Sequence, residues 1–294
     1  MEDYNCSLLL SSCDKYTDAL APFFTLLYMM WPELTMPVYL NTESQNFGLE
    51  GHAIECLHPI SPLDKKGRPI SWSNRLRQAL ERVDSQYIML MLEDFFLQSP
   101  VRNDVVIDCL KWMHEDPTIG HIDFYHEPFV DGLVRGEFSL VDSSYDYAMN
   151  TLPGLWRKDF LISMLRDENP WDFEFYGTGR WRRTSVKIYT HRGEFPPVFD
   201  FGLDPELGYG IFRGKWLKNN KALFDQYGIE VDYDNLGVWD QLPELKARER
   251  EKHWLLHDFI KIIKQPSILA HYVECTNNVL KDKLRHVKQR HFNP

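Results

Sequence analysis

The sequence has no long hydrophobic run, and no stretch approaches the roughly 18 apolar residues that a membrane-spanning helix needs. Its first residues, MEDYNCSLLLSSCD, start acidic and hold only a short apolar run, unlike a secretory signal peptide. The five cysteines are widely separated and form no CxxC pair, which excludes a disulfide framework and a zinc site of the usual spacing. These absences predict a cytoplasmic chain.

Several nucleotide-binding and hydrolytic motifs are also missing. The sequence has no GxGxxG, so a dinucleotide fold of the usual kind is unsupported, and no GxxxxGK[ST] phosphate loop. It has no GxSxG elbow, and no cysteine has the setting of a nucleophile, so hydrolysis through a covalent triad has no support. The 16 glycines and 17 prolines are scattered, which excludes collagen-like and low-complexity classes.

What the chain has in excess is acid and aromatic residues. Its formal net charge of -10 argues against binding to nucleic acid, because that needs a basic surface. Residues 246–294 hold 11 Lys and Arg against 5 Asp and Glu, so this tail carries +6 and the rest of the chain -16. A basic tail can contact a membrane surface or an acidic partner, although such runs are more often solvated helical faces. The aromatic content of 14% excludes intrinsic disorder.

The 294 residues suffice for one large domain or two small ones. Short apolar segments and helical patterns alternate over the first 125 or so, which is typical of an α/β sheet with parallel strands. The predicted strands are 6–11, 36–40, 53–57, 87–92 and 121–125, and the predicted helices are 17–31, 73–83 and 104–115.

The second half is less regular. We expect strands at 136–142 and 186–189, a helix at 157–166, an aromatic-rich loop at 169–181 and polar helices at 245–264 and 267–290. The predicted division is a domain over 1–244, with a nucleotide-binding half (1–126) and an acceptor-facing half (127–244), followed by a helical basic tail (245–294).

Glu93 and Asp94 carry the strongest chemical signal, because they directly follow the most apolar strand pattern, YIMLML. Ligands of open α/β sheets bind outside the carboxyl ends of the strands. Adjacent carboxylates repel, so they need exposure, cationic partners or a metal, and a divalent cation on a diphosphate would satisfy them. The alternative is a strand-end acid that caps the next turn.

Two other segments suit a nucleotide. Ser12 and Asp14 follow the first predicted strand, where a small hydroxyl lets a ligand approach and Asp14 could accept from a ribose or base; equally, Asp14 could cap a helix. Trp72 offers a stacking face and Arg75 a fork of donors for phosphate near a helix start. Otherwise Trp72 is core and Arg75 pairs with a surface acid such as Glu81.

Asp172 and Glu174 stand between aromatic residues in NPWDFEF. A carboxyl group against apolar rings has a raised pKa, which suits a general base, and aromatic rings also line carbohydrate sites. The alternative is a structural Trp171 flanked by two solvated acids.

Cations follow at Arg180, Arg182, Arg183 and Lys215, and could bind phosphates, although nearby arginines are usually surface residues. His191 is a candidate metal ligand, although a lone histidine is more often structural.

Taken in order, these segments resemble the GT-A-type glycosyltransferases of bacterial surface polysaccharide and lipopolysaccharide synthesis. The resemblance extends from about residue 7 to residue 216 and rests on LLLSSCDKYTDAL, MPVYLNTES, WSNRLRQAL, YIMLMLEDFFL, LWRKDFL, NPWDFEFYG and GKW.

The resemblance implies a Rossmann-like GT-A mixed sheet flanked by helices and a nucleotide diphosphate sugar as donor. It implies a glycan or lipid-linked acceptor, reached by an enzyme that can touch the inner face of the membrane through its basic tail. Ser12, Asp14, Trp72 and Arg75 would lie at the nucleotide. Glu174 or Asp172 would deprotonate the acceptor hydroxyl.

In the same comparison, Glu93-Asp94 resembles the acidic DxD-type motif that holds Mn²⁺ or Mg²⁺ on the diphosphate, with Asp94 as ligand. Phe95 stands where the family pattern has a second acid, which leaves a metal-independent site open, with Arg180, Arg182, Arg183 and Lys215 as the cations. A sugar nucleotidyltransferase and a non-catalytic nucleotide- or carbohydrate-binding protein remain as alternatives.

Overall fold

The computed structural model describes residues 4–127, 132–143, 145, 147–202 and 210–239. The predicted basic tail at 245–294 lies outside these residues. In the described part, no helix is long and apolar enough to cross a membrane.

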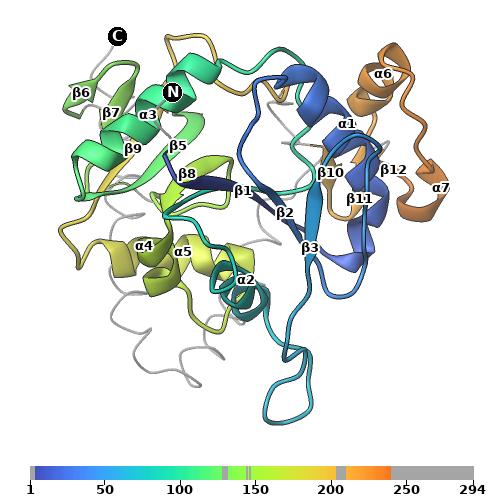
Figure 1. Ribbon diagram of the computed structural model, residues 1–294, viewed down its shortest axis with the longest axis horizontal. Coiled ribbons are helices and arrows are strands. Elements are labelled where there is room, and N and C mark those ends of the chain that lie inside the picture. Colours follow the sequence, from blue (N-terminus) through green and yellow to red (C-terminus); the bar gives the residue numbers. More distant parts are fainter. Residues whose placement is uncertain (1–3, 128–131, 144, 146, 203–209, 240–294) are drawn as a thin grey trace, which may run out of the picture.

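Among the described residues, nine strands form one mixed sheet in the order β3-β2-β1-β4-β8-β5-β9-β7-β6 (Figure 1). Their bounds are β1 Cys6–Ser11, β2 Val38–Asn41, β3 Ile54–Leu57, β4 Tyr87–Met91, β5 Ile119–Glu127, β6 Val134–Arg135, β7 Phe138–Leu140, β8 Gly154–Arg157 and β9 Lys187–Arg192. Strands β3, β2, β1 and β4 run parallel, as expected from the alternating pattern. The predicted α/β class with a mixed sheet flanked by helices is confirmed.

Strand β8 runs antiparallel between β4 and β5, and the sequence pattern does not indicate it. Leu90 of β4 and Asp123 of β5 both pair with Gly154 at the start of β8. The loop that leads into β8 therefore arrives at the same edge of the sheet at which β4 and β5 end.

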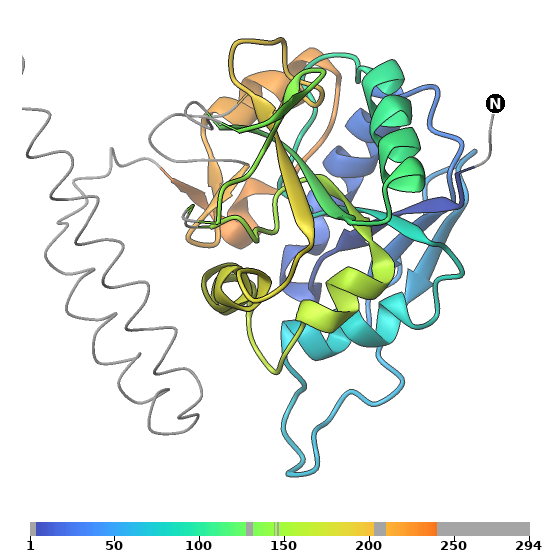
Figure 2. The ribbon, with the colours of Figure 1, turned by 90° about the vertical axis from the view of Figure 1, so that its left-hand side faces the viewer.

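Helices cover both faces of the sheet (Figures 1 and 2). The α-helices are α1 Leu20–Met30, α2 Trp72–Leu80, α3 Asn103–Glu115, α4 Lys158–Met164, α5 Pro170–Trp181, α6 Asn219–Gln226 and α7 Tyr233–Leu236. The core has two parts: α1, α3 and α6 pack on one face, and α2, α4 and α5 on the other. Alternate residues of the central strands supply both parts, so that Leu8 and Leu10 face the first and Leu9 the second.

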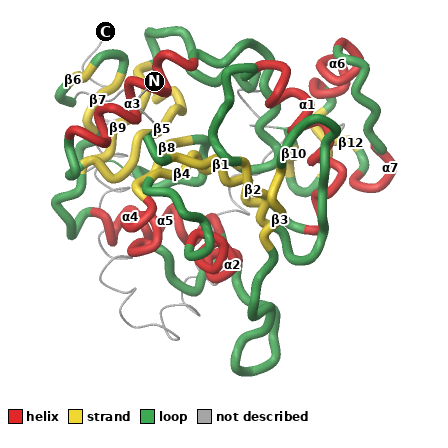
Figure 3. The backbone as a smooth tube through the Cα atoms, viewed as in Figure 1, coloured by secondary structure: helices red, strands yellow, loops and turns green. Residues whose placement is uncertain are grey.

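A small second sheet consists of β10 Ile211–Phe212, β11 Lys215–Leu217 and β12 Val238–Trp239. It is tied to the main sheet where β4 ends, because the Gly210 N–H donates to the Asp94 carbonyl at 2.9 Å. Figure 3 shows these strands beside α1, together with the long loop between β3 and α2.

The largest difference from the sequence expectation is α5, because residues 169–181 were predicted to be an aromatic loop. The Asn169 side chain caps the helix by accepting from the Asp172 N–H, and Pro170 occupies the first turn. Phe173 and Trp181 turn into the core, whereas Trp171 remains 69% exposed. The aromatic spacing in this segment therefore belongs to an amphipathic helix rather than to a loop.

Candidate functional site

The ends of three parallel strands meet at one edge of the sheet. Ser11 at the end of β1 pairs in register with Asn41 at the end of β2, and Leu10 pairs with Met91 at the end of β4. Residues 12–14, 42–45 and 92–94 therefore extend from neighbouring strands beyond the same edge. This is the edge at which open α/β sheets bind ligands.

Glu93 and Asp94 lie just beyond β4. Glu93 is buried and accepts a hydrogen bond from the Ser12 side chain; Asp94 is half-buried and accepts from the Ile211 N–H of β10. Burial raises the pKa of both carboxyl groups, and the charge of Asp94 raises the pKa of Glu93 further. The pair is therefore short of positive charge, which a bound cation would supply.

Arg75 projects from the first half of α2 into this group. It is buried, donates from Nη2 to the Ser12 carbonyl at 2.6 Å and forms an ion pair with Glu43 through Nη1. The alternative of a surface acid as its partner therefore holds among the described residues, with Glu43 in place of Glu81. Burial lowers the pKa of Arg75 overall, and the negative charge of Glu93 offsets part of this shift.

Two buried polar groups near this edge have no hydrogen-bond partner among the described residues. One is the complete side-chain amide of Asn41, which is only 1% exposed, and the other is Nε of Arg75. Buried donors and acceptors are nearly always paired in native proteins. A polar ligand or a bound water can supply the partner of such a group, and Nε of Arg180 on α5 is unpaired in the same way.

Asp14 organises the loop that follows β2. Its carboxylate accepts from the Ser44 N–H and hydroxyl and from the Gln45 N–H, at 2.6 to 3.1 Å. Burial opposes ionisation, but these hydrogen bonds and Arg75 lower the Asp14 pKa overall. Its N–H donates to Glu43 at 2.6 Å. Asp14 thus holds the loop of residues 42–45 against the end of β1.

Trp72 connects the strand edge to α5. Its indole N–H donates to the Ser11 hydroxyl at 3.0 Å, and its ring lies 5.7 Å from the ring of Phe173 on α5. Phe173 is fully buried and is adjacent in sequence to Glu174. The predicted nucleotide-side and acceptor-side segments therefore meet through this pair of rings.

Glu174 is half-buried on α5 and contacts the loop before β8. Its Oε1 accepts from both the N–H and the hydroxyl of Thr151, at 2.9 and 2.7 Å. Burial raises the pKa of Glu174 in spite of these two hydrogen bonds. Asp172 has a different setting, because its carboxylate accepts from the Asn169 amide at 2.8 Å within the helix cap.

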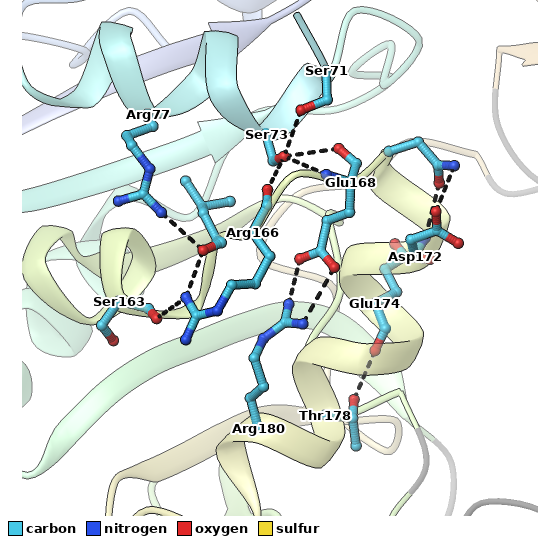
Figure 4. A network of polar contacts seen from close by, with 12 residues as sticks. Ser71, Ser73, Arg77, Ser163, Arg166, Glu168, Asp172, Glu174, Thr178 and Arg180 are labelled. Atoms are coloured by element: carbon cyan, nitrogen blue, oxygen red, sulfur yellow. Dashed lines mark hydrogen bonds and ion pairs between the residues drawn. The ribbon is translucent and has the colours of Figure 1, made fainter. Parts of the chain in front are cut away.

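A polar network joins α2 to α5 (Figure 4). The Ser73 hydroxyl donates to the Glu168 carbonyl at 2.8 Å and accepts from the Glu168 N–H at 2.9 Å. The Glu168 side chain, which is 7% exposed, forms a two-pronged ion pair with Arg180 of α5. Arg180 is thereby held inside the structure by its own glutamate.

The other predicted cations and the histidine lie apart from one another. Arg182 donates to the carbonyls of residues 143 and 145, whereas the exposed Lys215 follows Gly214, which lies against Lys15 just after β1. His191 is buried in β9, with Nε2 3.4 Å from a Glu137 carboxylate oxygen. Strand β9 is three positions from β4, or roughly 14 Å at the usual strand spacing. No group of three or more metal-ligating side chains occurs among the described residues.

Four residues of this region were not predicted from the sequence: Asn41, Glu43, Asp123 and Thr151. Asp123 is a buried carboxylate inside the apolar strand pattern HIDFY, a signal that was available. Glu43 and Thr151 meet their partners 29 to 32 and 23 residues away in sequence, so no local pattern marks them.

No family model matches this chain, and no curated protein matches its sequence. Among solved structures, it is similar to residues 1–349 of S. aureus TarS, with 8% identity and a TM-score of 0.42 over 64% of this chain and 60% of that one. It is also similar to CMP:2-keto-3-deoxy-manno-octonic acid synthetase complexed with CTP (12% identity, TM-score 0.36, 64% and 89% covered). A third is the bifunctional IspDF of Campylobacter jejuni (11% identity, TM-score 0.34, 64% and 50% covered). At these scores we derive the function from the residues of the site alone.

Proposed function

We propose that this protein is a glycosyltransferase that moves a sugar from a nucleotide diphosphate sugar to a hydroxyl of a glycan or lipid-linked acceptor. The observation that carries the proposal is the strand edge at β1, β2 and β4. There the unpaired amide of Asn41, the unpaired Nε of Arg75 and the acid pair Glu93-Asp94 lie together. A nucleotide with a charged diphosphate and its cation would supply the missing partners.

On this proposal the donor lies along the strand edge. Asn41 and the Ser12 region face the nucleoside, Trp72 offers a ring for stacking, and Arg75 binds diphosphate oxygens after Glu43 releases it. Lys215 adds a cation from the β10–β11 turn. The departing nucleoside diphosphate gains negative charge, so cationic groups here stabilise the transition state more than the bound substrate.

The carboxylates of Glu93, which is buried, and Asp94, which is half-buried, suit Mg²⁺ or Mn²⁺, because these ions prefer oxygen ligands. When bound, such an ion would supply positive charge to the diphosphate. His191 lies on β9, three strands from β4, so we propose Asp94 and Glu93 as the ligands rather than Asp94 and His191.

Glu174 is the proposed base. The acceptor oxygen forms a bond to the anomeric carbon as its proton passes to the Glu174 carboxylate. The bond between that carbon and the phosphate oxygen breaks, and its electron pair leaves with the nucleoside diphosphate. The raised pKa of Glu174 makes its carboxylate a stronger base, whereas Asp172 is engaged in the cap of α5.

Thermal shift with UDP, GDP and CDP, each with and without Mn²⁺, tests the donor site, because a ligand of the native state raises the melting temperature. At least one diphosphate should stabilise the protein, and Asp94→Ala should remove any Mn²⁺ dependence. Stabilisation by nucleoside triphosphates alone, with pyrophosphate release from a sugar phosphate, would instead identify a nucleotidyltransferase. If no nucleotide shifts the melting temperature, the proposal fails.

Transfer from the nucleotide sugar that stabilises the protein tests the base. Glu174→Gln should leave nucleotide binding intact and lower the transfer rate by about 10²- to 10⁴-fold, the usual range for loss of a general base. Full activity in this variant would exclude Glu174 as the base. Donor binding without turnover in the unmodified protein would favour a non-catalytic binding protein.

A further inference from the structure

The loop before β8 is built around two side chains that hold Glu174 and Asp123. Asn150 donates from Nδ2 to Oδ2 of Asp123 at 2.7 Å and accepts from the Leu152 N–H at 3.1 Å. Its neighbour Thr151 makes the two hydrogen bonds to Glu174. Asn150 and Thr151 are both buried, so these contacts form inside the structure, away from competing water.

Asp123 anchors this loop to the sheet. It lies in β5 and accepts from the Tyr125 N–H at 2.8 Å with its other oxygen. On its far side the loop is fixed to α5, where the Met149 N–H donates to the Thr178 hydroxyl at 3.0 Å. The position of Thr151 is therefore determined from both sides, by a strand and by a helix.

The two oxygens of the Glu174 carboxylate are not equivalent. Oε1 receives both hydrogen bonds from Thr151, whereas Oε2 accepts none from the described residues. A carboxylate fixed through one oxygen has its other oxygen in a defined direction, as a group that must receive a proton requires.

We infer that Thr151 is a positioning residue for the proposed general base, holding Glu174 through Oε1 so that Oε2 takes the proton of the acceptor hydroxyl. This inference rests on the proposed function. It adds that the loop before β8, anchored by Asp123 and Asn150, sets both the direction and the proton affinity of the base. Loss of the Thr151 hydroxyl removes one hydrogen bond to the carboxylate and makes protonation easier.

The charged groups on the elements around α5 are engaged elsewhere. On α2, Arg75 pairs with Glu43 and Arg77 donates to the Leu165 carbonyl. Lys158 of α4 donates to the Val83 carbonyl at 2.8 Å. Glu168 pairs with Arg180, and Asp172 accepts from the Asn169 amide. Asp167 accepts from the Asn74 amide, whereas Arg166 and Arg182 donate to backbone carbonyls. Burial and Thr151 are accordingly what sets the Glu174 pKa among the described residues.

The test is the pH profile of kcat/KM for transfer in Thr151→Val and Thr151→Ser. The reaction needs ionised Glu174, and Glu93 and Asp94 also have raised pKa values, so the limb that belongs to Glu174 is the one that Glu174→Gln removes. Removal of a hydrogen bond to a charged group should move this limb up by about one pH unit in the valine variant. The serine variant keeps the hydroxyl and should retain the original profile. Thr118→Val is the matched control, because the Thr118 hydroxyl also donates to a carboxylate, Asp116, in the exposed turn before β5.

An unshifted acidic limb in folded Thr151→Val would overturn the inference, and Thr151→Ala replaces the valine variant if that one does not fold. Direct ¹³C titration of the Glu174 carboxyl group separates this inference from the proposed function, because it needs no turnover. An unchanged Glu174 pKa in the titration refutes the role of Thr151. A raised pKa, with full transfer activity in Glu174→Gln, supports the contact and refutes only the role of Glu174 as base.

Discussion

Two arginines on helices beside the sheet, the buried Arg75 and the half-buried Arg180, each pair with a glutamate, and the two glutamates differ. Arg180 of α5 is held by Glu168, whose side chain is 7% exposed and whose backbone is fastened to Ser73 of α2. Arg75 of α2 is held by Glu43, whose side chain is 46% exposed in the loop after β2. A partner inside the structure fixes the geometry, whereas a partner at the surface can be exchanged for a ligand. The exposure of the glutamate, rather than that of the arginine, therefore separates a fixed ion pair from one that a ligand can replace.

The two ion pairs should differ most in how much each contributes to the stability of the fold. Glu168→Ala leaves Arg180 without its buried counter-charge and should lower the free energy of unfolding by about 3 kcal/mol or more. Glu43→Ala should cost less than about 1 kcal/mol, because its carboxylate is half in solvent and Arg75 retains the Ser12 carbonyl and the nearby Glu93 charge. Urea denaturation of both variants measures the difference. Equal losses would refute the distinction between the pairs.

For nucleotide affinity we expect the opposite order, with a larger effect at Arg75 than at Arg180. Arg75→Ala removes the fork of donors for the diphosphate and should raise the dissociation constant of the stabilising nucleoside diphosphate by about 10- to 100-fold. Arg180→Lys keeps the charge beside Glu168 and should leave that constant unchanged. Calorimetric titration provides the measurement, and comparable weakening in both variants would place Arg180 in the donor site too.

Glu43→Gln should give the smallest effect, and in the favourable direction. Its carboxylate occupies Arg75 and the Asp14 N–H, two donors suited to a phosphate oxygen. Neutralising it removes a competing anion and should tighten nucleoside diphosphate binding several-fold, a change of up to about 1 kcal/mol. Glu50→Gln, an exposed change between β2 and β3, is the control. Weaker binding in Glu43→Gln would mean that Glu43 contacts the ligand itself.

The elements predicted most accurately were those with a local signal. Strand β1 follows from the apolar run CSLLLS, and β4 from YIMLML, because a strand buried on both faces needs apolar residues throughout. The acid pair after β4 was found for the same reason, since its position beyond a strand is visible in the chain. Helix α5 was missed although its start, Asn169-Pro170, is a typical cap and first turn, because the interleaved aromatics obscured its period.

The remaining features depend on contacts between distant segments. Nothing in the four residues of β8 indicates that they run antiparallel between β4 and β5, because that order is decided by the whole sheet. The roles of Asn41 and Glu43 likewise emerge only when α2 brings Arg75 beside the ends of β1 and β2. Asn103 shows the same limit at smaller scale: it stands directly before the predicted helix 104–115, where asparagine often caps, but its side chain accepts from the Trp31 indole N–H instead.

The reversed direction of β8 has a consequence for how such a protein can diversify. In an all-parallel sheet every loop at the ligand-binding edge follows a strand, so each change there also alters the path to the next helix. Here the segment that carries Asn150 and Thr151 precedes its strand and ends at Gly154, where β8 begins to pair with β4 on one side and β5 on the other. Insertions upstream of residue 150 can therefore change the surface beside Glu174 while the register of the sheet and the ends of β1, β2 and β4 stay as they are. The antiparallel direction of β8 thus lets the segment before it vary in length while the ends of the parallel strands β1, β2 and β4 keep their positions.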